Sequence, residues 1–233
     1  MKKTAAITFI VVFAALLAQA AGPRTITRNL SAAGIEVLDL DSGIGDVEIR
    51  AIEGIDEIHI EIILTPRRGG LFSSKRKAEQ EVEAASLSTK TKGNRLSMQI
   101  TPQADDDRRF EENWSIEAPA GINLEVNHGV GDLDIRGGIA SIEVDSGVGD
   151  VFVEVAEGDI TIDLGVGKAV VKAPAAAYAS AEGAGGVGDA RLTVLGEKIS
   201  SGGFVGHAAS WEGKGKDHIE VSVGVGDAVI TLE

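Results

Sequence analysis

Apolar and polar residues alternate over short stretches along most of the chain, and the alternation changes phase at a recurring tetrapeptide. The apolar positions around the copy at 147–150 are even-numbered before it and odd-numbered after it: Ile142, Val144 and Val148, then Val151, Val153 and Val155. Strict alternation over about five to seven residues is typical of strands with one buried face. We therefore predict that each tetrapeptide is a corner between two strands, with its valine inside and its Asp outside.

The tetrapeptide, Gly-Val-Gly-Asp or a close variant, occurs seven times. The copies lie at 43–46, 129–132, 147–150, 165–168, 186–189, 204–207 and 224–227. Apart from a gap of 86 between the first two, their last glycines are 18 to 21 residues apart. A period of this size predicts stacked repeats. We expect an all-β fold, a β-solenoid with about 18–21 residues and two short strands per turn.

The gap between the first two copies predicts an insertion over about residues 51–118. A strand is expected at 55–64, a helix at 74–85, and a hairpin with strands at 87–91 and 96–101. An exposed loop at 105–109 follows, and residues 114–118 return the chain to the sheet.

The amino terminus resembles a secretory signal peptide. Lys2 and Lys3 precede an apolar run from Ala5 to Leu17, and Ala18-Gln19-Ala20 is a small-x-small cleavage signal. We predict a signal peptide at 1–20, cleavage near Ala20, and a single domain at 21–233. The chain has no cysteine, so disulfides and thiol chemistry are excluded.

These features together resemble the bacterial putative-adhesin domains of unknown function, of the toast-rack and head-GIN types. The resemblance rests on the signal peptide, the inserted strand, helix and hairpin, the return segment 114–119 (Trp-Ser-Ile-Glu-Ala-Pro) and the repeated Gly-Val-Gly-Asp strands. It covers nearly all of the mature chain. It implies a right-handed β-solenoid outside the cytoplasm, periplasmic or secreted. The family motif is not specific for any activity, and from the residues we expect a non-enzymatic, adhesin-like scaffold or interaction module of the cell envelope.

The charge of the chain limits its partners. The formal net charge is −14, so nucleic acid is not an expected partner. Residues 67–109 are the exception, with ten basic and six acidic residues. This region is either a solvated insertion or a patch for anionic lipid or polysaccharide.

The last residues of the tetrapeptides are candidates for a binding column. In register, the stack would place Asp132, Asp150, Lys168, Asp189, His207 and Asp227 in one line. Such a column could bind a cation, since hard cations favour carboxylate oxygens. A polysaccharide is the other ligand considered for the column. Because Lys168 and His207 interrupt it, a structural role at the corner is the preferred interpretation.

No catalytic, cofactor-binding or metal-binding residue is assigned. The four histidines, His59, His128, His207 and His218, show no metal-ligand spacing, and no nucleophile motif is present. The aromatic residues are too scattered for a binding platform, although Phe152 falls on the outward phase. The strand at 228–232 has no evident cap, so it is a candidate edge for self-association.

Overall fold

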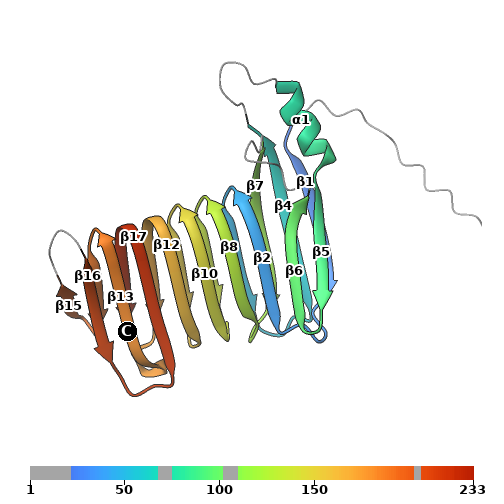
Figure 1. The fold of residues 1–233 in the computed structure, drawn as a ribbon. Helices are drawn as coiled ribbons and strands as arrows, with labels where there is room; N and C mark the ends of the chain where they lie inside the picture. Colours follow the sequence, from blue (N-terminus) through green and yellow to red (C-terminus); the bar gives the residue numbers. More distant parts are fainter. Residues whose placement is uncertain (1–21, 68–74, 102–109, 202–205) are drawn as a thin grey trace, which may run out of the picture.

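The alternating segments form strands of one 17-stranded sheet, with a single α-helix in the described part of the chain (Figure 1). The structure is a computed structural model that describes residues 22–67, 75–101, 110–201 and 206–233. The predicted signal peptide, the loop at 105–109 and the first two residues of the tetrapeptide at 204–207 lie outside the described residues. The expectation of a nearly all-β fold is confirmed.

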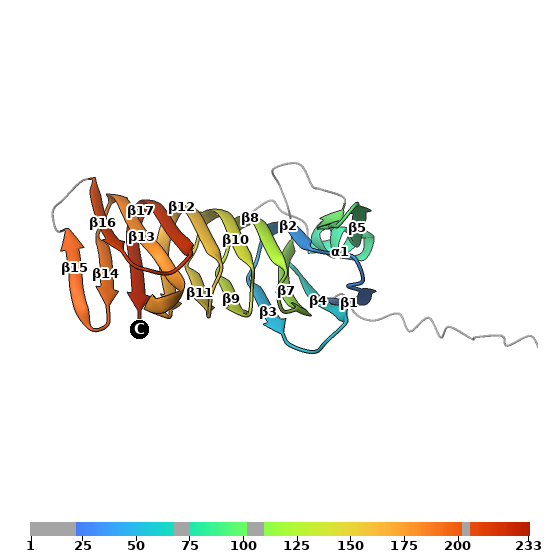
Figure 2. The same ribbon diagram turned by 90° about the horizontal axis from the view of Figure 1, so that it is seen from below.

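Most strands lie in two rows that face each other across the core (Figures 1 and 2). We call one strand of each row, joined by a corner, a rung. Neighbouring rungs pair in parallel, for example Ile142 with Ile160 and Val151 with Ala169. The corner from row A to row B, which carries the tetrapeptide, is the first corner. The return is the second corner.

The rows contain the following strands in spatial order. Row A consists of β6 (Arg95–Thr101), β2 (Val37–Ile44), β8 (Asn123–Val130), β10 (Ser141–Val148), the first parts of β12 (Asp159–Ala173) and β17 (Asp217–Leu232), and β13 (Tyr178–Val187). Row B consists of β7 (Phe110–Pro119), β3 (Val47–Ile52), β9 (Leu133–Gly137), β11 (Val151–Val155), the second parts of β12 and β17, and β14 (Ala190–Val194). A 3-10 turn, η1 (Ala175–Ala177), follows β12.

The spatial order of the rungs differs from their order in the sequence. Strands β6 and β7 pair in parallel with β2 and β3, so part of the expected insertion is itself a rung. At the other end, β17 lies between β12 on one side and β13 and β14 on the other. The prediction that residues 228–232 form a free edge is therefore wrong, because the C-terminal strand is paired along both sides.

Antiparallel strands and the helix close the two ends of the stack. At one end lie β5 (Ser86–Lys92), β4 (Glu57–Pro66), β1 (Arg24–Ser31) and α1 (Lys75–Ala84). The positions of β4, α1 and the β5–β6 hairpin match the predicted strand, helix and hairpin, whereas β1 was not predicted. At the other end lie β15 (Glu197–Ser201) and β16 (His207–Glu212). The Arg24 guanidinium donates to the carbonyls of Val82, Glu83 and Ala85, which satisfies acceptors at the end of α1.

The first corner explains the phase change, but not in the predicted way. Ser146 and Val151 are the successive inward residues, and the chain turns between them. Because they are an odd number of positions apart, the inward phase switches from even to odd. Gly149 has a φ of 143°, and a Cβ there would lie 1.8 Å from the Gly131 carbonyl oxygen, so only glycine fits.

Candidate ligand-binding surface

The last residue of each first corner forms a hydrogen-bond ladder along the stack. The amide of Asp132 donates to Oδ1 of Asp46 (3.0 Å), that of Asp150 to Oδ1 of Asp132 (2.9 Å), and that of Lys168 to Oδ1 of Asp150 (2.9 Å). The Asp189 amide donates to Oδ1 of Asp227 (3.1 Å). The carboxylates of Asp46, Asp132, Asp150 and Asp227 therefore each accept a backbone hydrogen bond from the neighbouring rung, and these bonds give the corner residues the structural role that was predicted.

The members of this column differ from those predicted. His207 begins the capping strand β16, opposite Gly185, and is not in the column. Asn113 is a member, since its Oδ1 accepts the amide of Asp46 (2.9 Å). The sequence did contain a signal for Asn113, because it precedes the buried Trp114 as Asp46 precedes Val47.

The tetrapeptide valines point to solvent, which corrects the prediction that they lie in the core. Their side chains are between 44% and 50% exposed, and the residues concerned are Val130, Val148, Val166, Val187 and Val225. The corresponding buried position is two residues earlier, where Ser42, His128, Ser146, Leu164 and Val223 follow one another along the stack.

A groove of about 560 Å³ crosses the row B end of the first corners. Its lining contains five carboxylates, one amide and the ring of Phe152. The polar residues are Asp46, Glu48, Asn113, Asp132, Asp134 and Asp150, and the remaining lining residues are Val47, Trp114 and Leu133. Because the carboxylates are fixed to successive rungs, they form a regular array on a rigid support. This array is the best candidate site in the described part of the chain.

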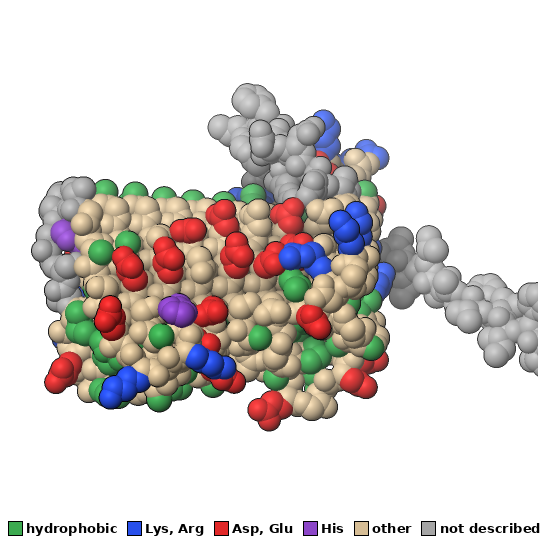
Figure 3. All heavy atoms as spheres, turned by 60° about the horizontal axis from the view of Figure 1, so that its bottom comes forward, with side chains coloured by type: hydrophobic (Ala, Val, Ile, Leu, Met, Phe, Trp, Pro, Cys, Tyr) green, Lys and Arg blue, Asp and Glu red, His purple; other side chains and the backbone are tan. Residues whose placement is uncertain are grey.

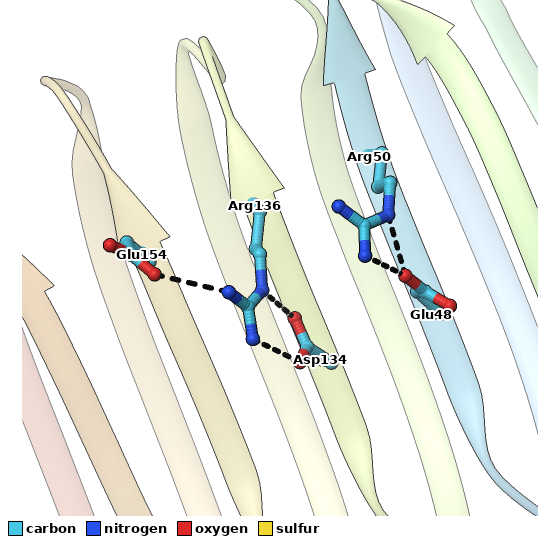
Figure 4. Close-up of polar contacts among 5 residues, drawn as sticks. All are labelled: Glu48, Arg50, Asp134, Arg136 and Glu154. Carbon is cyan, nitrogen blue, oxygen red and sulfur yellow. Dashed lines mark hydrogen bonds and ion pairs between the residues drawn. The ribbon is translucent and has the colours of Figure 1, made fainter.

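Ion pairs hold the side chains next to the groove (Figure 4). Arg136 donates to both oxygens of Asp134 (2.7 and 2.8 Å) and to Glu154 (3.3 Å), and Arg50 pairs with Glu48 in the adjacent strand. The hydrogen bonds with Asp134 raise the pKa of Arg136. The network leaves Asp46, Asp132 and Asp150 as the groove carboxylates with no ion pair to a described residue.

Phe152 faces outward, as predicted, but its ring is not a free platform. The Arg136 guanidinium lies 4.7 Å from the ring centre and the Lys172 ammonium 5.4 Å. Tyr178 is fully buried and Trp211 packs against the core, while Phe204 lies outside the described residues.

A second depression of about 800 Å³ lies at the other end of the same strands. Glycine, alanine and proline form much of its lining, together with Glu53, Glu154, Lys172 and the C-terminal Glu233. Its charges are mixed, so it offers less selectivity for a ligand than the groove does.

Row A presents a second acidic surface, and Figure 3 shows acidic side chains spread along this face. Glu143, Asp145, Asp163, Glu182 and Glu220 are exposed on β10, β12, β13 and β17. Asp145 and Asp163 lie directly opposite each other on adjacent strands. Nearer the first rung, Arg95 pairs with Glu125 (2.6 Å) and approaches Asp39 (3.6 Å).

In the part of the chain that the structure describes, neither the carboxylates nor the histidines form a metal centre. Among the described residues, no group of three or more histidine, aspartate or glutamate side chains could hold a metal ion. His59 bonds to Asn29 (2.7 Å), His218 lies 3.3 Å from Asp159, and His128 is buried. Burial lowers the pKa of His128.

The basic region at 67–109 is partly neutralised by acidic neighbours. Arg67 pairs with Glu111 (3.3 Å), and Arg95 pairs with Glu125 as described above. Residues 68–74 and 102–109 lie outside the described residues. The described part of the chain contains no helix with the length and hydropathy of a membrane span.

Comparisons with known proteins identify the fold. No family model and no curated protein matches the sequence. The structure is similar to that of a "putative cell adhesion protein" from Clostridium sporogenes ATCC 15579, with a TM-score of 0.59, 21% identity, and 91% of this chain and 100% of that chain covered. At this identity the likeness concerns the fold alone.

Two further structures have lower scores, which carry no conclusion about this chain. A "putative adhesin" from Bacteroides fragilis NCTC 9343 has a TM-score of 0.34 and 14% identity, covering 89% of this chain and 97% of that chain. A "putative lipid binding protein" from Parabacteroides distasonis ATCC 8503 has a TM-score of 0.27 and 12% identity, covering 91% and 97%.

Proposed function

We propose that the protein is a non-enzymatic, extracytoplasmic interaction module of the cell envelope, an adhesin-like scaffold built as a β-solenoid. The groove at the first corners carries the proposal, because it arrays carboxylates on a rigid support across successive rungs. The predicted signal peptide supports the location. The name of the Clostridium protein supports an adhesive role.

The groove also favours a class of ligand. Asp46, Asp132 and Asp150 each keep one carboxylate oxygen free of the ladder, and Asn113 adds an amide. Such acceptors bind hydroxyl and ammonium groups, so a neutral or amino-sugar polysaccharide fits this surface. The alternative of a divalent cation is less favoured, because the carboxylates lie in a line and do not converge.

Calorimetric titration with a chitosan hexamer, cellohexaose and polygalacturonate tests the proposal. We expect heat with the chitosan hexamer and none with polygalacturonate, which the carboxylates repel. The double variant Asp132→Asn/Asp150→Asn keeps the amide acceptors, as Asn113 does, and removes two charges. It should bind chitosan about tenfold more weakly, a loss of about 1.4 kcal/mol.

Asp163→Asn is the matched control, since Asp163 is an exposed carboxylate on row A outside the groove. This variant should bind chitosan like the wild type. Absence of heat with both chitosan and cellohexaose would reject a polysaccharide ligand for the groove.

A further inference from the structure

The outward valines of the first corners form a continuous apolar ridge. Val130, Val148, Val166, Val225 and Val187 follow one another on adjacent strands, each directly opposite the next. Figure 3 shows hydrophobic side chains in a row along the upper edge of the stack. The residues beside each valine are glycines, so no neighbouring side chain in the same corner covers the ridge.

The glycines of each corner are needed because neighbouring rungs lie too close for a side chain there. This requirement does not explain why the residue between the two glycines is a valine. A Cβ at Gly147 would lie 2.5 Å from the Gly129 carbonyl oxygen, and Gly149 is restricted as described above. The residue between them points to solvent, where a polar side chain would be accommodated. A valine at every one of these positions therefore keeps apolar surface exposed on an acidic protein.

Carboxylates flank one part of the ridge on both sides. Asp145 and Asp163 lie on the row A side, and Asp132 and Asp150 on the row B side. No described residue forms an ion pair with these four carboxylates. On the row B side, Lys168 is the last residue of the corner that carries Val166, and farther along Arg191 pairs with Asp189 (2.5 Å) and Asp227 (3.3 Å). The four carboxylates without an ion pair therefore lie beside Val130, beside Val148 and on the row A side of Val166.

We propose that Val130, Val148 and Val166 bind a basic amphipathic helix of a partner protein. Its apolar stripe would lie on the ridge, and lysine or arginine on each side of the stripe would pair with the flanking carboxylates. A second copy of this chain would bring carboxylates against carboxylates, and an anionic lipid surface would be repelled. This inference goes beyond the polysaccharide groove, because it uses the valines and the row A carboxylates.

Fluorescence anisotropy with a labelled 18-residue Leu/Lys peptide tests the inference. One peptide has its leucines on a single helical face, and a scrambled peptide has the same composition and charge without that face. The wild-type chain should bind the amphipathic peptide at least about tenfold more tightly than the scrambled one. Val130→Thr/Val148→Thr/Val166→Thr should remove this preference, since threonine keeps the β-branched shape and adds a hydroxyl.

Val170→Thr/Val229→Thr is the control, because these valines also face outward but lie on row B, away from the ridge. It should bind both peptides like the wild type. The inference is overturned if the wild type does not distinguish the peptides, or if the ridge variant retains the preference.

Two other occupants have their own tests. Dimerisation in sedimentation experiments that the ridge variant abolishes would assign the ridge to a second copy, and ridge-dependent binding to phosphatidylcholine/phosphatidylglycerol vesicles would assign it to a lipid surface. Either result overturns the helix proposal. The chitosan titration remains independent, because the ridge variant leaves Asp132 and Asp150 in place.

Discussion

At the scale of single residues, the first-corner aspartates stabilise the stack through one oxygen each. Asp150→Ala removes the acceptor of the Lys168 amide and should lower the free energy of unfolding by about 1 kcal/mol. Asp150→Asn should keep most of the stability, because Asn113 makes the same bond in its own rung. Urea denaturation of the two variants measures the difference.

Asp163→Ala is the control for that prediction. Asp163 is exposed and lies opposite Asp145, so its removal should leave the stability unchanged or raise it slightly by relieving repulsion. Equal losses in Asp150→Ala and Asp163→Ala would show that the ladder does not contribute to stability.

The alternation of apolar and polar residues predicted which segments are strands. It did not predict which residues at each corner face the core. Val148 continues the even phase of Ile142 and Val144, so hydrophobicity alone places it in the core. The structure buries the polar Ser146 in that phase and exposes Val148. The chain turns after Ser146, and a period-two pattern carries no information about where a turn begins.

At the scale of elements, the interior position of β17 can be tested by two neighbouring substitutions. Ile230 is fully buried between β12 and β14, whereas Thr231 faces outward and is half-buried. Ile230→Ala should lower the free energy of unfolding by about 2–5 kcal/mol, because it leaves a cavity in the core. Thr231→Ala should change it by at most about 0.5 kcal/mol. Thermal or urea unfolding followed by circular dichroism measures both. Small effects from both substitutions would mean that the strand is a loosely held edge.

The order of the rungs could not be predicted from the repeats. The copies of the tetrapeptide are nearly identical, so every rung presents a similar edge for pairing. Any two rungs could therefore pair in parallel with the same register, and the sequence does not specify which rungs are neighbours. The rung of β6 and β7 lacks the tetrapeptide altogether, with Glu112-Asn113 at its corner. Long-range packing, including the closure of the ends by α1, β15 and β16, selects the observed order.

At the scale of the whole molecule, the residues that stabilise the stack lie in the core, whereas the candidate binding residues lie on the surface. The core is one continuous apolar cluster between the two rows, and the corners fix the outer side chains on its surface. Binding surfaces can therefore vary without disturbing the core, as the replacement of Asp by Lys168 and Asn113 at equivalent corners shows. The candidate groove was predicted only as an aspartate column, because its shape depends on which rungs are neighbours.

Among the buried titratable groups of the described residues, His128 should make the stability of the fold depend on pH. His128 is 1% exposed and lies between Ser42 and Ser146 on the adjacent strands. Burial lowers its pKa in the folded state, while the attraction of Asp46 and Asp132 acts in the opposite direction. The unfolded chain therefore binds a proton more readily, so stability should fall as the pH drops below about 6.5, by at most about 1.4 kcal/mol per pH unit.

His128→Leu isolates this contribution, because Leu164 occupies the equivalent inward position two rungs along. The free energy of unfolding, measured in urea between pH 7.5 and 5, should depend less steeply on pH in His128→Leu than in the wild type. Carboxylates titrate in both proteins, so the difference between the two slopes reports the histidine. Parallel slopes would mean that His128 is protonated equally in the folded and unfolded chain, which its burial between two rungs opposes.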